Sequence, residues 1–311
     1  MSRQVLIAAP IHDVLAEGLQ SAGYELRFAT DITQQKAFTL IADCEGVITS
    51  TRLQLNKELL DVAPNLQWIG RMGSGMEVID VPYATARGIK CFSSPEGNSN
   101  AVAEHALGML LSLSNRISWS HREILQGKWL REENRGFELE GKTIGIIGFG
   151  HTGRAFARKL SSFDVNIIAY DILQLSNIPN YVTVATDLNI IFDQANIISF
   201  HVPLNQETFH YLDKSFIEKM TNPFVLINTS RGDVVDTFSV YQAAMEGKIT
   251  GVCLDVAEGE PLEKMTVTER DIYNKLISLP EVVVTPHIAG YTHEALFKMS
   301  KTLLGRIVTA S

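Results

Sequence analysis

Short apolar runs alternate with longer stretches of helical periodicity along most of the chain. A buried run followed by an amphipathic helix is the repeating unit of a parallel β-sheet. In the first third, strands are expected at residues 4–8, 25–28, 46–48, 66–70 and 90–92, with helices between them such as 12–21 and 56–62. This part of the pattern predicts an α/β domain.

The alternation starts again after a long central helix, which the periodicity places at residues 100–126. Further strands are expected at 143–147, 166–170, 197–200, 224–228, 251–254 and 282–285, followed by a last helix over 291–311. Two such blocks predict two doubly wound parallel-sheet domains of α/β class, each able to bind ligands at the carboxyl ends of its strands. We place the domains at residues 1–99 with 290–311, and at residues 100–289.

Composition narrows the class of protein. The 311 residues are 45% hydrophobic and carry a net charge of −8, which allows a core and disfavours nucleic acid or an anionic membrane as partner. No apolar run approaches the roughly 20 residues of a membrane span. The three cysteines lie far apart and no signal-peptide pattern occurs, so a reduced, cytoplasmic protein is expected. No grouping of His, Asp or Glu has metal-ligand spacing, so no metal is expected.

A first glycine motif, at residues 136–143, formally matches the G-x-x-x-x-G-K-[ST] loop of nucleotide hydrolases. That loop binds phosphates only when a strand precedes it and a helix follows. Here the strand-like run 144–147 follows, and Glu138 and Glu140 would lie inside the phosphate cradle. A magnesium-dependent nucleotide hydrolase is therefore an alternative that the local context opposes.

A second glycine motif, at residues 148–153, has the required context, because a strand precedes it and a helical stretch follows. In such a loop Gly148 permits the tight turn, Gly150 lets the backbone approach a pyrophosphate, and Gly153 lets helix and strand pack closely. His151 and Thr152 complete the loop. The pyrophosphate charge would rest on the helix N-terminus.

The strand after this motif ends in Asp171, 18 residues beyond Gly153. A carboxylate at that place accepts hydrogen bonds from the ribose 2′-hydroxyl and repels a 2′-phosphate. Residues 172–180 contain no Lys or Arg that could neutralise a phosphate. The sequence therefore favours NAD over NADP as the cofactor.

With these residues the chain resembles the D-isomer-specific 2-hydroxyacid dehydrogenases over most of its length. Besides 148–153 and Asp171, the resemblance rests on segments in family order at 71–75, 98–105, 201–208, 227–232, 254–256, 260–261 and 285–290. It implies a flavodoxin-like substrate domain beside a Rossmann NAD-binding domain.

The resemblance implies a catalytic arginine, acid and histidine, which fall on Arg231, Glu260 and His287. A guanidinium can hold the carboxylate of a 2-keto acid and polarise its carbonyl. An imidazole can donate the proton to the carbonyl oxygen, or accept it in the oxidative direction, and a neighbouring acid stabilises the imidazolium. Glu258 is a rival for the acid, but the family acid precedes a proline, as Glu260 does.

The resemblance also implies binding roles. Backbone N–H groups of Gly73, Ser74 and Gly75 would hold the substrate carboxylate, because small residues allow close approach. Further cofactor contacts would come from His201, Pro203, Thr208, Thr229, Asp255 and Gly290.

Within the family, segments 70–71, 97–99, 127–131 and 136–143 resemble the D-3-phosphoglycerate dehydrogenase branch in a short form without regulatory domain. The expected reaction is oxidation of D-3-phosphoglycerate to 3-phosphohydroxypyruvate, or the reverse, as in serine biosynthesis. A phosphorylated acid needs additional cations, for which Arg52, Arg71 and Arg131 are candidates, the last reaching in from a partner subunit. Solvated surface charge is the competing interpretation of these arginines.

Two alternatives remain open at this point. One is a glyoxylate or hydroxypyruvate reductase with the same machinery. The other, of a different class, is an NAD(H)-sensing binding protein without significant turnover. The long helix and the segment 127–142, with Trp119 and Trp129, also resemble the dimer contacts of the family, so a homodimer is expected.

Overall fold

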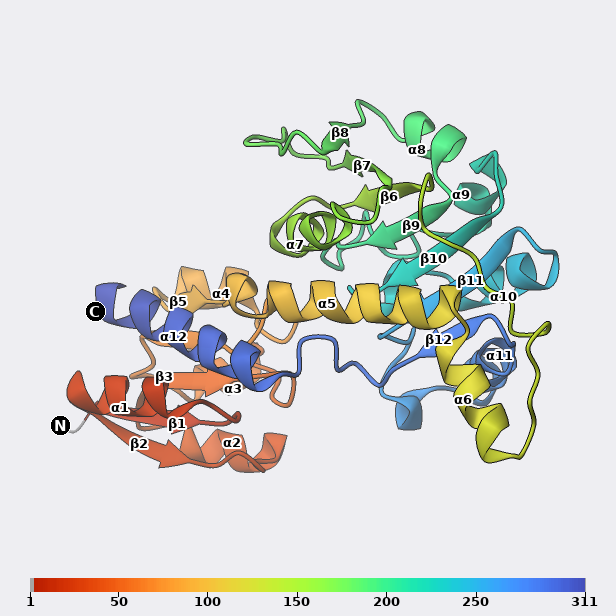
Figure 1. Ribbon diagram of the computed structural model, residues 1–311. Coiled ribbons are helices and arrows are strands. Elements are labelled where there is room, and N and C mark those ends of the chain that lie inside the picture. The colour runs from red at the N-terminus through yellow and green to blue at the C-terminus, as the bar shows by residue number, and fades with distance from the viewer. Residues whose placement is uncertain (1–2, 311) are drawn as a thin grey trace. The chain divides into compact units, whose positions relative to one another are not determined.

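The computed structural model describes residues 3–310 of the chain, which divides into two compact units (Figure 1). One unit is formed by Met1–Asn100 with Tyr291–Ser311, and the other by Ala101–Gly290. Within the described residues, none of the helices combines the length and apolarity that a membrane span requires.

The first unit is built on a parallel sheet in which the strands follow the order β2-β1-β3-β4-β5. Its strands are β1 (Arg3–Ile7), β2 (Tyr24–Phe28), β3 (Cys44–Thr49), β4 (Trp68–Arg71) and β5 (Lys90–Phe92). This is the flavodoxin-like order, with its switch point between β1 and β3.

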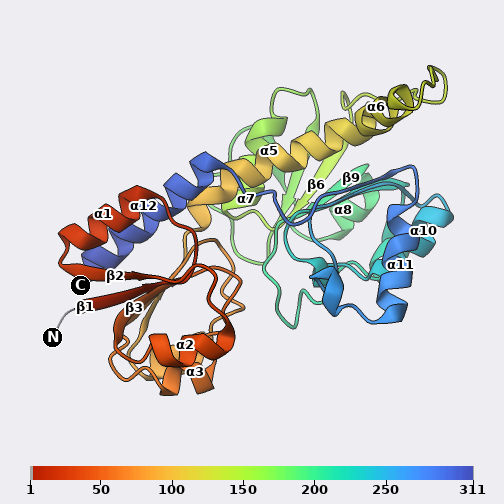
Figure 2. The same ribbon diagram turned by 90° about the horizontal axis from the view of Figure 1, so that it is seen from below.

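Alternate residues of these strands enter two separate cores because side chains of a strand point to opposite faces. Val5 and Ile7 pack with α1 (Asp13–Ser21) and α12 (His293–Ala310), which lie side by side in Figure 2. Leu6 and Val47 face the helices on the other side of the sheet. Those helices are α2 (Gln34–Leu40), α3 (Lys57–Asp61) and α4 (Val81–Ala86).

The second unit is built on a longer parallel sheet in the order β12-β11-β10-β9-β6-β7-β8. Its strands are β6 (Thr143–Ile147), β7 (Asn166–Tyr170), β8 (Val182–Val184), β9 (Ile197–Phe200), β10 (Phe224–Asn228), β11 (Ile249–Leu254) and β12 (Val282–Val284). The chain reverses its direction of winding between β6 and β9. In a Rossmann sheet that switch point is where a dinucleotide binds.

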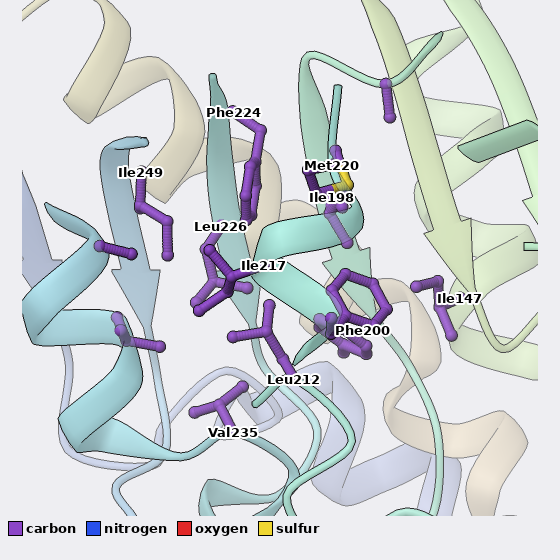
Figure 3. Close-up of a cluster of buried hydrophobic side chains, with 14 of the residues drawn as sticks. Ile147, Ile198, Phe200, Leu212, Ile217, Met220, Phe224, Leu226, Val235 and Ile249 are labelled. Carbon is purple, nitrogen blue, oxygen red and sulfur yellow. The ribbon is translucent and has the colours of Figure 1, made fainter. Parts of the chain in front are cut away.

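Helices cover both faces of this sheet. One face carries α8 (Asn189–Gln194), α9 (Lys214–Lys219), α10 (Thr237–Met245) and α11 (Val267–Ile277). Figure 3 shows part of this core, where Phe200 and Phe224 from the strands meet Ile217 from α9. The other face packs on α5 (Pro95–Ser114) and α7 (His151–Leu160) through Leu110 and Phe156. The predicted class of two doubly wound parallel-sheet domains is confirmed.

The expectation of a single helix over residues 100–126 is wrong. The structure has α5 (Pro95–Ser114) and a separate α6 (Ile117–Leu125), with Arg116 between them at a φ of 52°. The carbonyl of Ser114 accepts a hydrogen bond from Phe137 N–H over 2.9 Å instead of continuing the helix. A Cβ at Gly136 would lie 2.0 Å from that carbonyl oxygen, so the returning chain requires glycine there. The short edge strand β8 was also not predicted.

The first glycine motif does not form a phosphate loop. Residue Thr143 at its end is already the first residue of β6, so a strand follows the motif where a nucleotide loop requires a helix. Gly141 has a φ of 73° and its N–H donates to the carbonyl of Asp164. These residues make the turn that leads into β6.

Candidate active site

The second glycine motif forms the turn between β6 and α7. Gly148 has a φ of +90°, and a Cβ there would lie 2.5 Å from the carbonyl oxygen of His201. A Cβ at Gly153 would lie 2.2 Å from the carbonyl oxygen of Gly148, so both positions need glycine. Gly150 is the N-cap residue of α7 and has open space around the place of its Cβ. The turn therefore offers bare backbone at a helix N-terminus, which fits a diphosphate.

Asp171 follows β7 and is tied to this turn. Its Oδ2 accepts the N–H of Phe149 over 2.7 Å, and its Oδ1 accepts the N–H of Leu173 over 3.0 Å. A carboxylate oxygen can accept two hydrogen bonds, so each retains capacity for a ribose hydroxyl. The position of Asp171 thus fits recognition of an unphosphorylated ribose.

A cation that the sequence did not indicate lies close by. Arg154, in the first turns of α7, donates to the carbonyls of Ser176 and Asn177 over 2.7 and 3.1 Å. Its guanidinium also lies 4.8 Å from the ring centroid of Phe149. Residues 172–180 contain no cation of their own, but α7 supplies one to them.

The segment after β9 carries three of the expected cofactor residues. His201 is half-buried with its Nδ1 shielded from solvent, its Nε2 lies 2.9 Å from Ser199 Oγ, and desolvation lowers the pKa of His201 to about 3. His201 is therefore neutral near pH 7. The hydroxyl of Thr208 donates to the carbonyl of Pro203 over 2.6 Å. Thr208 and Pro203 thus shape their own loop.

The segment after β10 is organised by the buried side chain of Asn228. Its Oδ1 accepts from Ser230 N–H and from the Ser230 hydroxyl, and its Nδ2 donates to the carbonyl of Arg231 over 2.8 Å. These bonds fix the backbone that carries Arg231. In the described part of the chain the buried hydroxyl of Thr229 has no hydrogen-bond partner. It is thus a polar group available to a ligand.

Glu260 and His287 come together from the segments after β11 and β12, with a hydrogen bond between Glu260 Oε1 and His287 Nδ1. The other oxygen of Glu260 accepts the N–H of Ala257 over 3.0 Å. Burial alone raises the pKa of the Glu260 carboxyl. The hydrogen bond and charge of His287, the Ala257 N–H and the charge of Arg231 together lower this pKa by more than burial raises it, so the net shift is downward. This arrangement presents a fixed imidazole beside an ionised acid, as proton transfer requires.

The turn that carries His287 is held by Asp255, which is buried. Its carboxylate accepts the N–H groups of Ile288 and Ala289 over 2.9 and 2.8 Å, and its carbonyl accepts His287 N–H. His287 itself has a φ of 55°, an uncommon conformation for a residue with a side chain. Asp255 therefore holds the turn of His287 in place, a role that the sequence did not indicate. Gly290 follows this turn directly.

His105, on α5, joins the hydrogen bonds around Asp255, and this role was not predicted from the sequence. Its Nε2 lies 2.8 Å from the hydroxyl of Thr285 and 3.5 Å from Asp255 Oδ1. Because the Thr285 hydroxyl donates its one proton to Asp255 over 2.6 Å, His105 Nε2 must donate to Thr285. No local sequence pattern indicates this contact, since 180 residues separate His105 from Thr285.

In the first unit, the loop after β4 carries Gly73, Ser74 and Gly75. Gly73 N–H donates to the buried hydroxyl of Ser94 over 3.0 Å, so this N–H is engaged by the protein itself. The N–H groups of Ser74 and Gly75 are the ones left to a carboxylate. Gly73 has a φ of +137°, and a Cβ there would lie 2.2 Å from Arg71 Nη1.

The three candidate phosphate-binding arginines differ in their surroundings. Arg71 is only 7% exposed, and its guanidinium donates to the carbonyl of Met72. Arg52 is 53% exposed in its side chain and lies 3.6 Å from Asp31. Arg131 is exposed and lines a small cavity with Trp129 beside α6. Arg71 is thus not a solvated surface charge, whereas the other two are at the surface of their units.

Among residues 3–310, one group of potential metal ligands does form. Atoms of His210, Asp236 and Glu258 lie within 4.8 Å of one another. His210 Nε2 and Glu258 Oε1 are 2.5 Å apart, and Asp236 accepts Phe238 N–H and the Ser239 hydroxyl. Each of the three side chains therefore has hydrogen-bond partners within the protein, which explains the group without an ion.

Comparison with known proteins assigns the chain to a family. Residues 107–289 match the family described as D-isomer specific 2-hydroxyacid dehydrogenase, NAD binding domain. A glyoxylate reductase from Thermofilum pendens is 38% identical over 84% of this chain and 76% of its own length. A D-3-phosphoglycerate dehydrogenase from Archaeoglobus fulgidus is 32% identical over 98% of this chain but only 56% of its own length. The chain thus spans about half of that relative.

Among solved structures, a D-lactate dehydrogenase from Aquifex aeolicus, crystallised with NAD and lactic acid, has a TM-score of 0.84. It is 26% identical, and the likeness covers 99% of this chain and 95% of that one. The residues that match the family, 107–289, include the glycine turn at 148–153 and Asp171. This chain is a member of the D-isomer specific 2-hydroxyacid dehydrogenase family, with the NAD-binding domain of that family in its second unit.

Proposed function

We propose that the protein is an NAD-dependent dehydrogenase of D-2-hydroxy acids, with Arg231, Glu260 and His287 as its catalytic residues. The observation that carries the proposal is the hydrogen bond between Glu260 and His287, at the carboxyl ends of neighbouring strands in the NAD-binding unit. A histidine fixed by an ionised acid is the group that a keto acid needs as proton donor.

The glycine turn at 148–153, Asp171 and the Thr229 hydroxyl would hold NAD, which supplies or accepts the hydride when bound. His287 uses Nδ1 toward Glu260, which leaves Nε2 to give its proton to the carbonyl oxygen or to take the proton of the hydroxyl. Arg231 carries a permanent charge on a backbone fixed by Asn228, so it can bind the carboxylate in one orientation. Glu260 stabilises the imidazolium that forms in the oxidative direction.

For the substrate, we propose the couple of D-3-phosphoglycerate and 3-phosphohydroxypyruvate, which would place the enzyme in serine synthesis. The support is Arg71, a buried cation beside the loop that would bind the carboxylate. A charge kept in the interior at the cost of desolvation fits an anionic ligand group. Ser74 and Gly75 would supply the backbone N–H groups of that loop.

Reduction of glyoxylate or hydroxypyruvate is the second candidate. The glyoxylate reductase relative favours it, because this chain matches more of that protein's length than of the phosphoglycerate dehydrogenase. The exposed positions of Arg52 and Arg131 also favour a smaller, less charged substrate.

A homodimer in the cytoplasm completes the proposal. No residue of α6 is buried, and this includes its apolar residues. Leu125 is 74% exposed, and Trp129, just beyond the helix, is 78% exposed. Apolar surface of this kind favours association with a second copy. All three cysteines are free thiols, which suits a reducing compartment.

Oxidation of NADH with a panel of keto acids tests the substrate. The panel contains phosphohydroxypyruvate, hydroxypyruvate, glyoxylate, pyruvate and a branched-chain acid. We expect kcat/KM for phosphohydroxypyruvate to exceed the others by at least about tenfold, roughly the effect of one charged hydrogen bond. A higher value for glyoxylate or hydroxypyruvate would replace the first candidate by the second.

A further inference from the structure

Glu258 lies in the same acidic run as Glu260 but has a different set of contacts. Its Oε1 lies 2.5 Å from His210 Nε2, and its Oε2 accepts the backbone N–H of Thr237 over 2.9 Å. The ring of His287 is instead hydrogen-bonded to Glu260. Glu258 is thus left without a role in the proton transfer described above.

The contacts of Glu258 connect three segments that follow three adjacent strands. Residues 201–212 follow β9, residues 229–237 follow β10 and carry Arg231, and residues 255–261 follow β11 and carry Glu260. We call the second the Arg231 segment and the third the Glu260 segment. His210 belongs to the first, Thr237 to the second and Glu258 to the third. One carboxylate therefore joins all three.

Backbone contacts show how closely these segments fit together. His210 N–H donates to the carbonyl of Asp233 over 2.8 Å, and Gly259 N–H points to Asp233 Oδ1 at 3.4 Å. A Cβ at Gly232 would lie 2.0 Å from the carbonyl oxygen of Ala257. The backbone next to Arg231 is therefore packed directly on the backbone next to Glu258, two residues before Glu260.

His210 has further neighbours besides Glu258. Its φ of 49° is uncommon for a residue with a side chain, and its ring stacks on Phe209 with centroids 4.1 Å apart. A carboxylate oxygen of Asp236, which caps α10 at the end of the Arg231 segment, lies within 4.8 Å of a ring nitrogen of His210. Strained positions of this kind persist where the surrounding structure holds them.

We propose that Glu258 and His210 are a pair of positioning residues that sets the spacing between Arg231 and the Glu260–His287 pair. The pair touches no reacting atom and acts through the backbone of the two segments. A keto acid must be held by Arg231 while His287 reaches its oxygen, so a shift of one segment by about 1 Å costs up to about 10²-fold in rate. This inference rests on the proposed function for its effect on turnover, but its structural part does not.

Glu258→Ala and Glu258→Gln separate positioning from charge. Glutamine can accept Thr237 N–H through its oxygen and donate to a neutral His210 through its nitrogen, so it preserves both contacts. Alanine leaves Thr237 N–H and His210 without these partners. Glu246→Ala, at an exposed position at the end of α10, is the matched control.

The expected result is a fall in kcat/KM of about 30- to 100-fold for Glu258→Ala, shared between a higher KM for the keto acid and a lower kcat. Glu258→Gln should stay within about threefold of the unchanged protein, and the control within about twofold. The Kd for NADH should change much less than kcat/KM, since the turn at 148–153 and Asp171 are untouched. A variant that melts earlier but keeps kcat and KM would overturn the proposal in favour of a purely structural role.

Hydrogen exchange of the same variants gives a readout that does not depend on turnover. In Glu258→Ala, backbone amides in 231–237 and 257–260 should exchange faster, while those in 143–170 keep their rates. Unchanged exchange in both segments would overturn the positioning role whether or not the enzyme is active. Faster exchange in a protein that turns over no keto acid would support the positioning role and reject the proposed function.

Discussion

His287 Nδ1 and Glu260 Oε1 share a hydrogen bond, although the two side chains stand on segments after different strands. The bond fixes which nitrogen of the imidazole is left for a substrate. In the proposed reaction it also places an ionised acid beside a group that carries a positive charge for part of the cycle. The remaining contacts of the site hold the two segments in place.

Replacing Glu260 with glutamine tests the charge of this pair. Glutamine keeps an acceptor for Ala257 N–H but cannot stabilise an imidazolium, so kcat should fall about 10²-fold while the KM of the keto acid changes little. Steady-state kinetics measure both. Glu263→Gln, at an exposed position nearby, should behave like the unchanged protein. Full activity in Glu260→Gln would show that the acid has no part in the chemistry.

From the positions of Asp171 and Arg154 we expect that substitutions there alter the preference for NADH over NADPH. In Asp171→Ser the charge that repels a 2′-phosphate is gone, so the KM for NADH should rise about tenfold and the KM for NADPH should fall. Arg154, which already reaches the carbonyls of Ser176 and Asn177, is the cation available to the phosphate. Adding Arg154→Gln should remove the gain with NADPH. An unchanged ratio of NADH to NADPH use in Asp171→Ser would contradict the assignment of Asp171.

From the lowered pKa of His201 we expect the stability of the folded protein to depend on pH. Burial lowers this pKa from 6.5 to about 3, so between about pH 3 and pH 6.5 the unfolded chain binds up to one proton more than the folded protein. Stability therefore falls as the pH decreases, by about 2 kcal/mol from this group between about pH 7.5 and pH 5. His201→Gln, which can still bond Ser199, should lose about that part of the dependence.

Urea unfolding of the unchanged protein and His201→Gln at the two pH values measures the difference. His121→Gln serves as control, because His121 is exposed. If the acid sensitivity of the His201 variant equals that of the control, His201 does not contribute to it.

We expect Arg71 to discriminate between phosphohydroxypyruvate and glyoxylate. Because it is buried beside the Gly73 loop, Arg71→Gln should raise the KM for phosphohydroxypyruvate about tenfold or more, and the KM for glyoxylate much less. Arg52→Gln, at an exposed position, should change neither by more than about twofold. An equal loss with both substrates would mean that Arg71 only supports the loop. The KM values of the two variants for both acids decide this.

Features that depend on local sequence were predictable. The bounds of β6, β7, β9 and β10 agree with the expected strands, because each is a continuous apolar run between polar turns. The turn at 148–153 and Asp171 could be found from spacing and context alone. Arg231, Glu260 and His287 were indicated by their resemblance to family segments, and the choice of Glu260 over Glu258 agrees with the contact to His287.

Features that depend on distant contacts were not predictable. The break at Arg116 follows from a hydrogen bond between Ser114 and Phe137, which no periodicity reveals. His105, Ser94 and His210 act on partners between 21 and 180 residues away. The second role of Asp255, as the anchor of the His287 turn, required the fold that brings Ile288 and Ala289 to its carboxylate.

The most direct test of the account is the rate of NADH oxidation by the unchanged protein and by His287→Gln, with the best keto acid and with NADH binding measured in parallel. We predict turnover by the unchanged protein, and a fall of about 10³-fold in kcat for His287→Gln with the Kd for NADH kept within about twofold. Equal rates in the two proteins would contradict the role of His287. NADH binding without turnover by the unchanged protein would contradict the enzymatic function itself and favour an NAD(H)-sensing protein.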